Sequence, residues 1–422
     1  MPDAESPDAE SPALLFDPLS AAAIRDPYTA LAPLQAEAPV YRSDILGAWV
    51  VTRYDDIRAA FRDPRLSSDR IRPFIARAPA SMQDTLKPLG DHLNLWAVFT
   101  DPPDHTRLRG LMNRAFTARA VEALRPEIAR IVNRLLDDID AELERTGTRE
   151  FDLIHEFAYP LPALVIAHML GVPEKDVDKL KRWSDLLAKF VLTSRSDPQK
   201  YRMASDGIVE MEAWFRRFLK EHRASGSEDV TTGLLDARDE QDRLTTDELV
   251  ACCVLLLFAG HETTTQLIAN GMRALIENPA QMADLCENLG DVELVRNAVE
   301  EMLRFDGPSL SMVRVATEDF DWHGRHIARG DRLFLMMCAG NRDPRAFPEP
   351  HRFDIRRGEA KKNFAFGYGI HFCLGAPLAR LEAEIAFPLM LRRWPDIALA
   401  EDDPPWSDSI LNRGMLHMRV RV

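Results

Sequence analysis

The sequence predicts a mainly α-helical chain with a few small β-sheets. Apolar residues recur at helical spacing over most of its 422 residues. The alternation typical of strands is confined to Val40–Tyr54 and to short segments between residues 312 and 337. No stretch rich in Gly, Ser or Pro divides the chain. We therefore expect one domain over residues 13–422, preceded by a disordered acidic tail at residues 1–12.

Charge and cysteine content exclude several classes of protein. The chain has 53 Lys and Arg against 67 Asp and Glu, a net charge of −14, so its field repels phosphate backbones and disfavours a nucleic-acid partner. Its five cysteines are sparse and irregularly spaced, which indicates a reducing, cytoplasmic location. The main apolar run, Ala251–Gly260, is shorter than the roughly 20 residues of a bilayer span. We expect no membrane anchor and a monomer.

The N-terminal third combines a hairpin, a long connection and a helix. The hairpin is expected over Val40–Tyr54, followed by a short helix over Asp55–Phe61. Scattered Pro, Ser and charge predict an irregular connection over residues 65–97. Asp101, followed by two prolines, is expected to cap a helix that continues to Phe116.

Helices dominate the remainder of the predicted fold. They are expected over residues 123–144, 154–170, 175–223 with a break near 194–200, 245–278 with Thr245 or Thr246 as cap, 292–305 and 378–389. Pro388 is expected to kink the last helix or end it early. Short strands are expected at 312–316, 326–327 and 332–337, and a coil at 341–357.

The most specific segment is the glycine-rich loop Phe366–Gly375, immediately before the last helix. Its glycines at 367, 369 and 375 permit backbone angles and close approaches that a Cβ would block. Cys373 precedes a helix N-terminus, which should lower the pKa of its thiol and make it a soft ligand for iron. Two other interpretations are that Cys373 is a buried structural cysteine, or that it is a nucleophile activated by His371.

A second unusual segment is Ala259–Thr265, in the middle of an apolar helix. A glycine and three consecutive threonines are poor helix formers, and sequences tend to break local rules at functional sites. A Thr hydroxyl that bonds back to a carbonyl one turn earlier can open the helix and leave a polar notch. The alternative is an ordinary helix with an incidental glycine.

The pattern Phe-Gly-x-Gly-x-His-x-Cys-x-Gly over Phe366–Gly375 resembles that of the cytochrome P-450 family, and the resemblance extends in order over nearly the whole chain. It implies a triangular, mainly α domain of the soluble bacterial type that encloses haem b between the long helix and the last one. It implies that Cys373 ligates the haem iron, that Thr263 hydrogen-bonds the reacting oxygen and that Glu262 relays protons.

The resemblance also assigns supporting residues. It implies haem contacts for Phe366 and propionate contacts for His105, Arg109, Arg314 and His371. Glu301 and Arg304, which alone would indicate an exposed i,i+3 pair, are expected to be structural with Arg352 as third partner. By family position the substrate cavity is expected to be lined by Leu257, Ala259, Thr263, Leu310, Met312, Val313, Ile410 and Leu411, with residues 65–97 and 190–205 as mobile covers.

The implied function is a monooxygenase that hydroxylates or epoxidises a lipophilic small molecule with dioxygen. Electrons would come from NAD(P)H through a reductase and a ferredoxin or flavodoxin, with Arg114, Lys361, Lys362 and Arg380 as candidate docking residues. Two alternatives stay open: a peroxygenase driven by hydrogen peroxide, and a non-catalytic haem-binding sensor or carrier.

Overall fold

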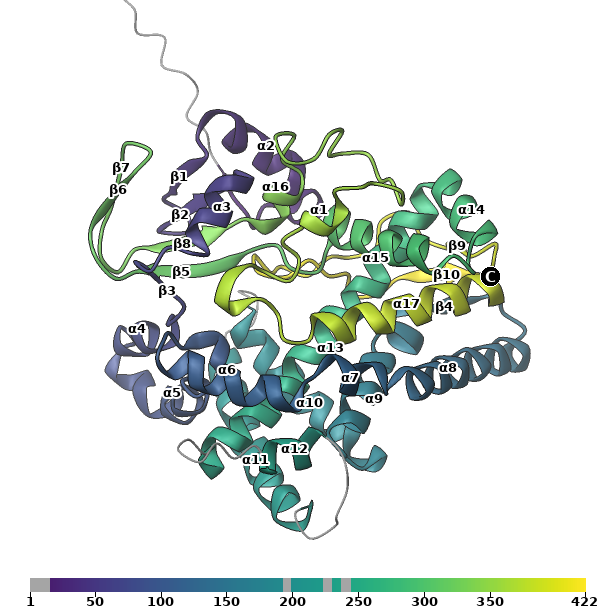
Figure 1. The fold of residues 1–422 in the computed structure, drawn as a ribbon, viewed down its shortest axis with the longest axis horizontal. Helices are drawn as coiled ribbons and strands as arrows, with labels where there is room; N and C mark the ends of the chain where they lie inside the picture. Colours follow the sequence, from purple (N-terminus) through teal and green to yellow (C-terminus); the bar gives the residue numbers. More distant parts are fainter. Residues whose placement is uncertain (1–15, 193–198, 223–229, 237–243) are drawn as a thin grey trace, which may run out of the picture.

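The computed structural model describes residues 16–192, 199–222, 230–236 and 244–422, and Figure 1 shows helices filling most of the molecule. The α-helices are α1 (Ala21–Arg25), α2 (Pro27–Glu37), α3 (Tyr54–Ala60), α4 (Ile71–Ala76), α5 (Ala80–Leu93), α6 (Asp104–Ala115), α7 (Ala118–Glu122), α8 (Arg125–Thr146), α9 (Pro160–Met169), α10 (Val177–Val191), α11 (Lys200–His222), α12 (Val230–Asp236), α13 (Thr246–Glu277), α14 (Pro279–Glu287), α15 (Val292–Asp306), α16 (Met337–Asn341) and α17 (Ala376–Arg393). A π-helical turn, η2 (Ile154–Ala158), precedes α9, and short 3₁₀ turns are η1 (Ala97–Phe99), η3 (Glu174–Asp176), η4 (Ala360–Lys362) and η5 (Gly369–His371).

Strands form three small sheets in the described part of the chain. The strands are β1 (Val40–Ser43), β2 (Ala48–Val51), β3 (Leu66–Ser67), β4 (Glu150–Asp152), β5 (Met312–Ala316), β6 (Phe320–Trp322), β7 (Arg325–Ile327), β8 (Arg332–Leu335), β9 (Ala398–Leu399) and β10 (Arg419–Arg421). The largest sheet has the order β1-β2-β8-β5-β3, with β2 parallel to β8 and the other neighbours antiparallel. In Figure 1 this sheet and the β6-β7 pair lie at the upper left, and the sheet of β4, β9 and β10 lies at the right. The predicted hairpin and the predicted strand at 312–316 are confirmed.

Helix α13 is the central element of the fold. The Thr245 hydroxyl accepts from the Glu248 N–H and the Glu248 carboxylate accepts from the Thr245 N–H, a reciprocal cap that starts the helix as predicted. The helix packs against α9, α11, α15 and α17, which explains its nearly continuous apolar sequence. Among the described residues it alone has the length and composition for a bilayer span, and 72% of its most apolar window is buried.

Two predictions about the N-terminal third are wrong. Residues 65–97 form β3, α4 and α5 rather than an irregular connection, because the apolar face of α5 packs against α11 and outweighs Pro88 in its interior. Asp101 does not cap α6, which begins at Asp104. Its carboxylate instead accepts hydrogen bonds from the Ser67 hydroxyl and from the Ser68 N–H.

The last helix also differs from its prediction, because it does not end at Pro388. Helix α17 continues to Arg393, packed against α8, α13 and α15, so tertiary contacts hold the turns after the proline in place. The predicted tail at residues 1–12 and most of the predicted break at 194–200 lie outside the described residues.

Candidate haem site

The loop before α17 holds Cys373 at the wall of a large cavity. Gly367 and Gly369 have φ angles of +70° and +76°, which only glycine adopts easily, so the predicted backbone requirement is confirmed at both positions. Gly375 has an ordinary φ of −78° and is the residue before α17. The Cys373 N–H donates to the Phe366 carbonyl at 2.9 Å, which closes the loop and fixes the position of the thiol.

The electrostatic surroundings of Cys373 act on its pKa in opposite directions. Burial raises the pKa of this thiol, and the N–H groups of Gly375 and Ala376 together with the guanidinium groups of Arg109 and Arg380 lower it by less. The helix N-terminus therefore lowers the pKa as predicted, but this effect is smaller than that of burial. A coordinating metal cation, by contrast, deprotonates a thiol outright.

The cavity beside Cys373, called the inner cavity below, contains about 1470 Å³ of empty space. The loop contributes Phe366, His371 and Cys373 to its wall, and α13 contributes Ala259 and Thr263. Residues from the middle and the last third of the chain thus meet around one apolar space.

Helix α13 is continuous where it meets this cavity. The Thr263 hydroxyl donates to the Ala259 carbonyl at 3.1 Å, as expected for a back-bonding threonine, yet the helix is not broken. The predicted opening of the helix is therefore absent. A Cβ on Gly260 would lie 3.0 Å from Ile166 Cδ1, so this glycine permits close packing against α9.

Glu262 does not line the inner cavity and belongs to a cluster on another side of α13. One oxygen or nitrogen atom each from Asp185, His261 and Glu262 lie within 4.8 Å of one another. His261 Nδ1 donates to the Leu257 carbonyl at 3.1 Å, which leaves the buried Nε2 facing Asp185 at 3.8 Å. Burial raises the pKa of Glu262, and Asp185 raises it further while His261 opposes both. The Asp185 side chain is 48% exposed and also accepts from Tyr159, so the cluster connects α13 with solvent.

Basic side chains gather at one end of the inner cavity. His105 and Arg109, one turn apart on α6, line it together with His371, and the rings of His105 and His371 are 4.1 Å apart. Arg314 is 4% exposed and lies beside them, over the Phe61 ring. Burial and the neighbouring basic groups of Arg314, His105 and Arg109 lower the pKa of His371 to about 3, so the cations of this cluster are the guanidinium groups of Arg109 and Arg314.

This cation cluster fits an anionic group from outside the chain. Burial lowers the pKa of Arg314 to about 10, and the one carboxylate that opposes this shift is Asp101, which is already hydrogen-bonded to two serines. Buried charges are normally paired, so this end of the cavity calls for carboxylates supplied by a ligand. A haem would supply two propionates to the cations and its iron to Cys373, and the apolar cavity would enclose its ring.

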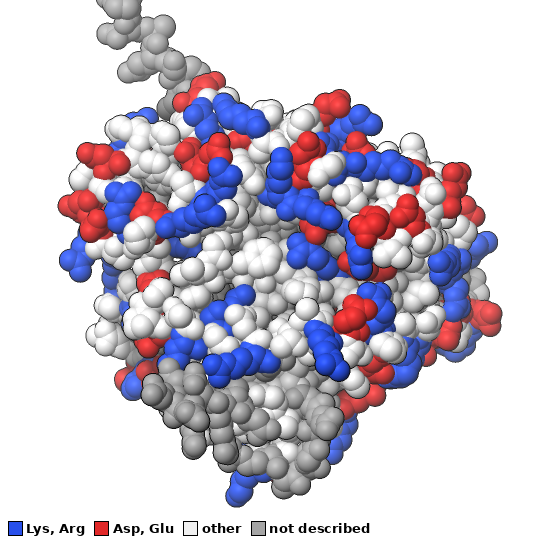
Figure 2. Space-filling view, viewed as in Figure 1, with Lys and Arg blue, Asp and Glu red and all other residues white. Residues whose placement is uncertain are grey.

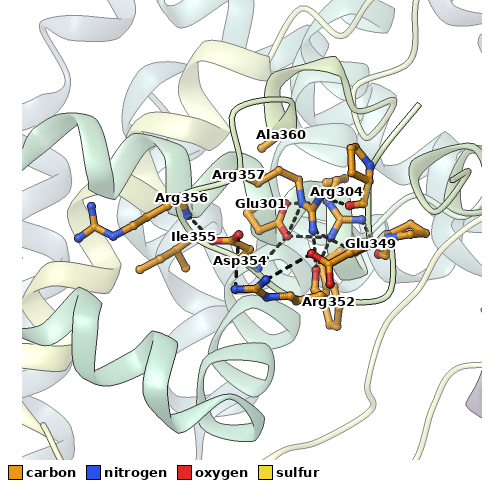
Figure 3. A network of polar contacts seen from close by, with 12 residues as sticks. Glu301, Arg304, Glu349, Arg352, Asp354, Ile355, Arg356, Arg357 and Ala360 are labelled. Carbon is orange, nitrogen blue, oxygen red and sulfur yellow. Dashed lines mark hydrogen bonds and ion pairs between the residues drawn. The ribbon is translucent and has the colours of Figure 1, made fainter. Parts of the chain in front are cut away.

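A second buried charge cluster lies between α15 and the coil at residues 349–357 and needs no ligand (Figure 3). The Glu301 carboxylate accepts from Arg304 Nε and Nη2, both at 2.7 Å, from Arg357 Nε at 3.2 Å and from the Asp354 N–H at 2.9 Å. Arg304 also donates to the backbone carbonyls of residues 341, 350 and 352. Glu301 and Arg304 have fully buried side chains, so the exposed-pair alternative is excluded.

The third guanidinium of this cluster belongs to Arg357, which corrects the prediction of Arg352. The side chain of Arg352 is 58% exposed and points to Glu349 and Asp354, and the residue reaches the cluster only through its carbonyl oxygen. Arg352 and Arg357 lie on the same turn-rich segment, so sequence spacing did not distinguish them. The cluster ties this coil to α15, as predicted.

The predicted substrate residues are divided among several places. Ala259, Thr263 and Met312 line the inner cavity, whereas Val313 and Leu411 line a second cavity that adjoins it. Leu257 is buried but lines neither cavity. It lies two residues before Ala259 on α13, so the two side chains point to roughly opposite sides of the helix. Leu310 and Ile410 line a small separate pocket, since they pack into the core between the first helices and the sheet.

Sequence reasoning missed several residues of the inner cavity. Its apolar wall includes Trp96, Phe99 and Phe258, and Trp96 stacks on Phe99 at 5.7 Å. Glu382 also lines it, fully buried in α17, with one carboxylate oxygen lacking a partner among the described residues. A sequence signal existed for Glu382, because it lies next to Leu381 on the apolar stripe of the last predicted helix.

The fold and the site define a protein that encloses a flat anionic prosthetic group beside a cysteine, and comparisons with known proteins identify the family. A family model described as Cytochrome P450 matches residues 50–411. The chain is 40% identical over 406 residues to "Cytochrome P450 monooxygenase PikC" of Streptomyces venezuelae, covering 94% of this chain and 91% of the relative. It is 39% identical over 404 residues to "Vitamin D(3) 25-hydroxylase" of Pseudonocardia autotrophica, covering 94% of each.

A solved structure agrees with these relatives. The structure of P450BioI in complex with hexadec-9Z-enoic acid ligated acyl carrier protein has a TM-score of 0.85 and 33% identity, and covers 95% of this chain and 98% of that one. This chain belongs to the cytochrome P450 family. It is a haem-thiolate oxidoreductase of the monooxygenase type, which incorporates one oxygen atom.

Proposed function

We propose that this chain hydroxylates or epoxidises a lipophilic small molecule with dioxygen, using Thr263 and Glu262 to deliver protons. The proposal rests on one observation: Thr263 lines the same cavity as Cys373, and its neighbour Glu262 belongs to a cluster that reaches solvent through Asp185. When bound, haem with a thiolate ligand supplies the redox chemistry and favours O–O cleavage.

The chain's own residues account for orientation and proton supply. The Thr263 hydroxyl is held by its bond to Ala259, so its oxygen has a fixed place at the cavity wall and can accept or pass on a proton. The raised pKa of Glu262 keeps its carboxyl protonated closer to neutral pH, which suits a general acid. Asp185, half exposed, can replace that proton from water.

Replacing Thr263 tests this assignment. We expect Thr263→Val to fold and to bind substrate, but to form less product per NAD(P)H consumed, with hydrogen peroxide formed instead. Thr265→Val is the matched control, because the Thr265 hydroxyl makes the same back-bond, to His261 at 2.9 Å, but does not line the inner cavity. Equal product yield in wild type and both variants would contradict the role of Thr263.

The electron donor is proposed to be a separate ferredoxin or flavodoxin reduced by an NAD(P)H-dependent reductase. On the face shown in Figure 2, Lys and Arg side chains surround an uncharged region over the loop before α17. Lys361 and Lys362 are exposed, whereas Arg380 is engaged by Glu300 at 2.7 Å. A locally basic surface on a chain of net charge −14 favours an acidic partner.

Reversing the charge of this surface tests whether an acidic electron donor binds there. Lys361→Glu with Lys362→Glu should slow reduction by an acidic ferredoxin and weaken its salt dependence, without changing turnover driven by hydrogen peroxide. Turnover on peroxide alone, with no response to any reduced ferredoxin or flavodoxin, would instead establish a peroxygenase. Failure to oxidise any member of a broad lipophilic panel would indicate a non-catalytic haem protein.

A further inference from the structure

A second cavity adjoins the inner one and leads away from Cys373. This outer cavity contains about 1800 Å³ of empty space and shares Arg70, Phe99 and Val191 with the inner cavity. Its walls come from α4 and α5, the end of α10, the start of α11, strands β5 and β8, and the turn before β8. A molecule can therefore extend from the inner cavity into the outer one.

The outer cavity is basic, although the chain as a whole is acidic. Its charged lining residues are five cations, Arg70, Arg77, Lys200, Arg329 and Arg332, and one acid, Asp331. In the whole chain, by contrast, acidic residues outnumber basic ones by 67 to 53. Such a bias of charge in a concave space raises the local concentration of anions.

The single acid of the outer cavity is already engaged. The Asp331 carboxylate accepts from Trp49 Nε1 at 2.8 Å and from the Ala328 N–H at 3.1 Å, and lies 4.0 Å from Arg42 outside the cavity. For Arg70, Arg77 and Arg329, no carboxylate among the described residues lies within ion-pair distance. Asp319 accepts from the Arg329 backbone N–H at 2.7 Å but forms no ion pair with its guanidinium group, so within the described part of the chain these three guanidinium groups have no carboxylate partner.

Two of these arginines come from segments that contact each other. Arg77 follows α4, and a Cβ added to Gly330 would lie 2.8 Å from Arg77 Nη2. Gly330 has a φ of +87° and directly follows Arg329, and both Arg77 and Arg329 line the outer cavity. Neither arginine lines the inner cavity, which makes them independent of the propionate cluster.

The remaining wall of the outer cavity is apolar and aromatic. The ring of Phe74 lies 5.6 Å from that of Phe190 and 6.1 Å from that of Tyr201. Met82 and Leu86 of α5 continue this surface. The outer cavity thus offers hydrophobic contact along its length and positive charge at its edge, a combination that suits an amphipathic anion.

We propose that the substrate is an elongated lipophilic carboxylate, whose anionic end binds Arg77 and Arg329 while its apolar end reaches the inner cavity. This inference rests on the proposed function and narrows its substrate class. It also sets the position of oxidation, because the carbon presented near Cys373 is remote from the carboxylate.

A matched set of ligands tests the charge preference. Dodecanoate, dodecanol and dodecylamine share one chain and differ at the end group, and their binding to the ferric holoenzyme can be measured by the Soret shift and by calorimetry. We expect dodecanoate to bind at least about tenfold tighter than the amine, a difference of about 1.4 kcal/mol. This preference should fall as salt is added.

Variants show which arginines cause the preference for the carboxylate. Arg77→Gln with Arg329→Gln should remove most of it, while Arg119→Gln, an arginine on α7 outside both cavities, should leave it unchanged. Equal or tighter binding of the amine, or a preference that survives the double variant, would overturn the inference. If the reduced carbon monoxide adduct still shows a thiolate spectrum in that case, the proposed function stands and only the substrate class is wrong.

Discussion

The two charge clusters of this protein differ in whether the chain itself supplies all the partners of their charged groups. Around Glu301, every charged group has hydrogen-bond partners within the chain: the carboxylate accepts from two guanidinium groups, and both of these also donate to backbone carbonyls. Around His371 and Arg314, basic groups lie close together beside the inner cavity, and among the described residues Asp101 is the acid that opposes the lowered pKa of Arg314. The first cluster is complete within the chain, whereas the second is completed by a ligand. A buried charge can thus be part of the fold or part of a binding site. The two cases are distinguished by whether the chain itself supplies all the partners of the charged groups.

The largest expected effect comes from breaking the complete cluster. Glu301→Gln leaves two buried guanidinium groups without a countercharge, and we expect it to lower the free energy of unfolding by about 3–5 kcal/mol. Urea unfolding followed by circular dichroism measures this. Glu293→Gln, which removes an exposed ion pair with Arg296 on the same helix, should cost less than about 1 kcal/mol. Similar losses in both variants would show that the buried cluster is not structural.

Removing a cation from the incomplete cluster should have the opposite effect on the protein without haem. Arg314→Met relieves repulsion and desolvation, so we expect the haem-free chain to gain about 1 kcal/mol of unfolding free energy. The same variant should release haem faster to a haem acceptor such as apomyoglobin, because a propionate loses its partner. A haem-free variant destabilised as strongly as Glu301→Gln would contradict the distinction between the clusters.

An effect that is smaller than that of Glu301→Gln, and that has a defined pH dependence, is expected at Glu382. Burial raises the pKa of its carboxyl well above the ordinary value, so the folded chain keeps a proton that the unfolded chain releases above about pH 4.3. Stability therefore falls as pH rises from that value toward the folded pKa. Glu382→Gln should exceed wild type in unfolding free energy by about 1–3 kcal/mol at pH 7, and the gain should vanish near pH 4. A gain that does not change with pH would contradict the raised pKa.

Sequence reasoning succeeded where local pattern and chemistry coincide. The capped start of α13, the strand at 312–316 and the glycine-dependent loop around Cys373 each depend on neighbours in the sequence. It failed where distant contacts decide the outcome. Asp101 bonds to serines more than thirty residues away instead of capping a helix, and α5 forms because α11 covers its apolar face.

Contacts between distant residues also limited the predictions for charged residues. The pairing of Glu301 with Arg304 follows from i,i+3 spacing, but the choice of Arg357 over Arg352 depends on how a coil turns. The basic outer cavity has no sequence signature, because its arginines come from the two residues that flank α4 and from the turn before β8 and β8 itself, some 250 residues apart. These positive charges come together only when the chain folds.

The most direct test of the haem-thiolate assignment is the absorption spectrum of the reduced carbon monoxide adduct, recorded for wild type and for Cys373→His. We predict the red-shifted Soret band of a thiolate-ligated haem in wild type and its loss in the variant, with haem still retained by the cation cluster. A wild-type protein that binds haem but gives the same unshifted band as Cys373→His would contradict ligation by Cys373.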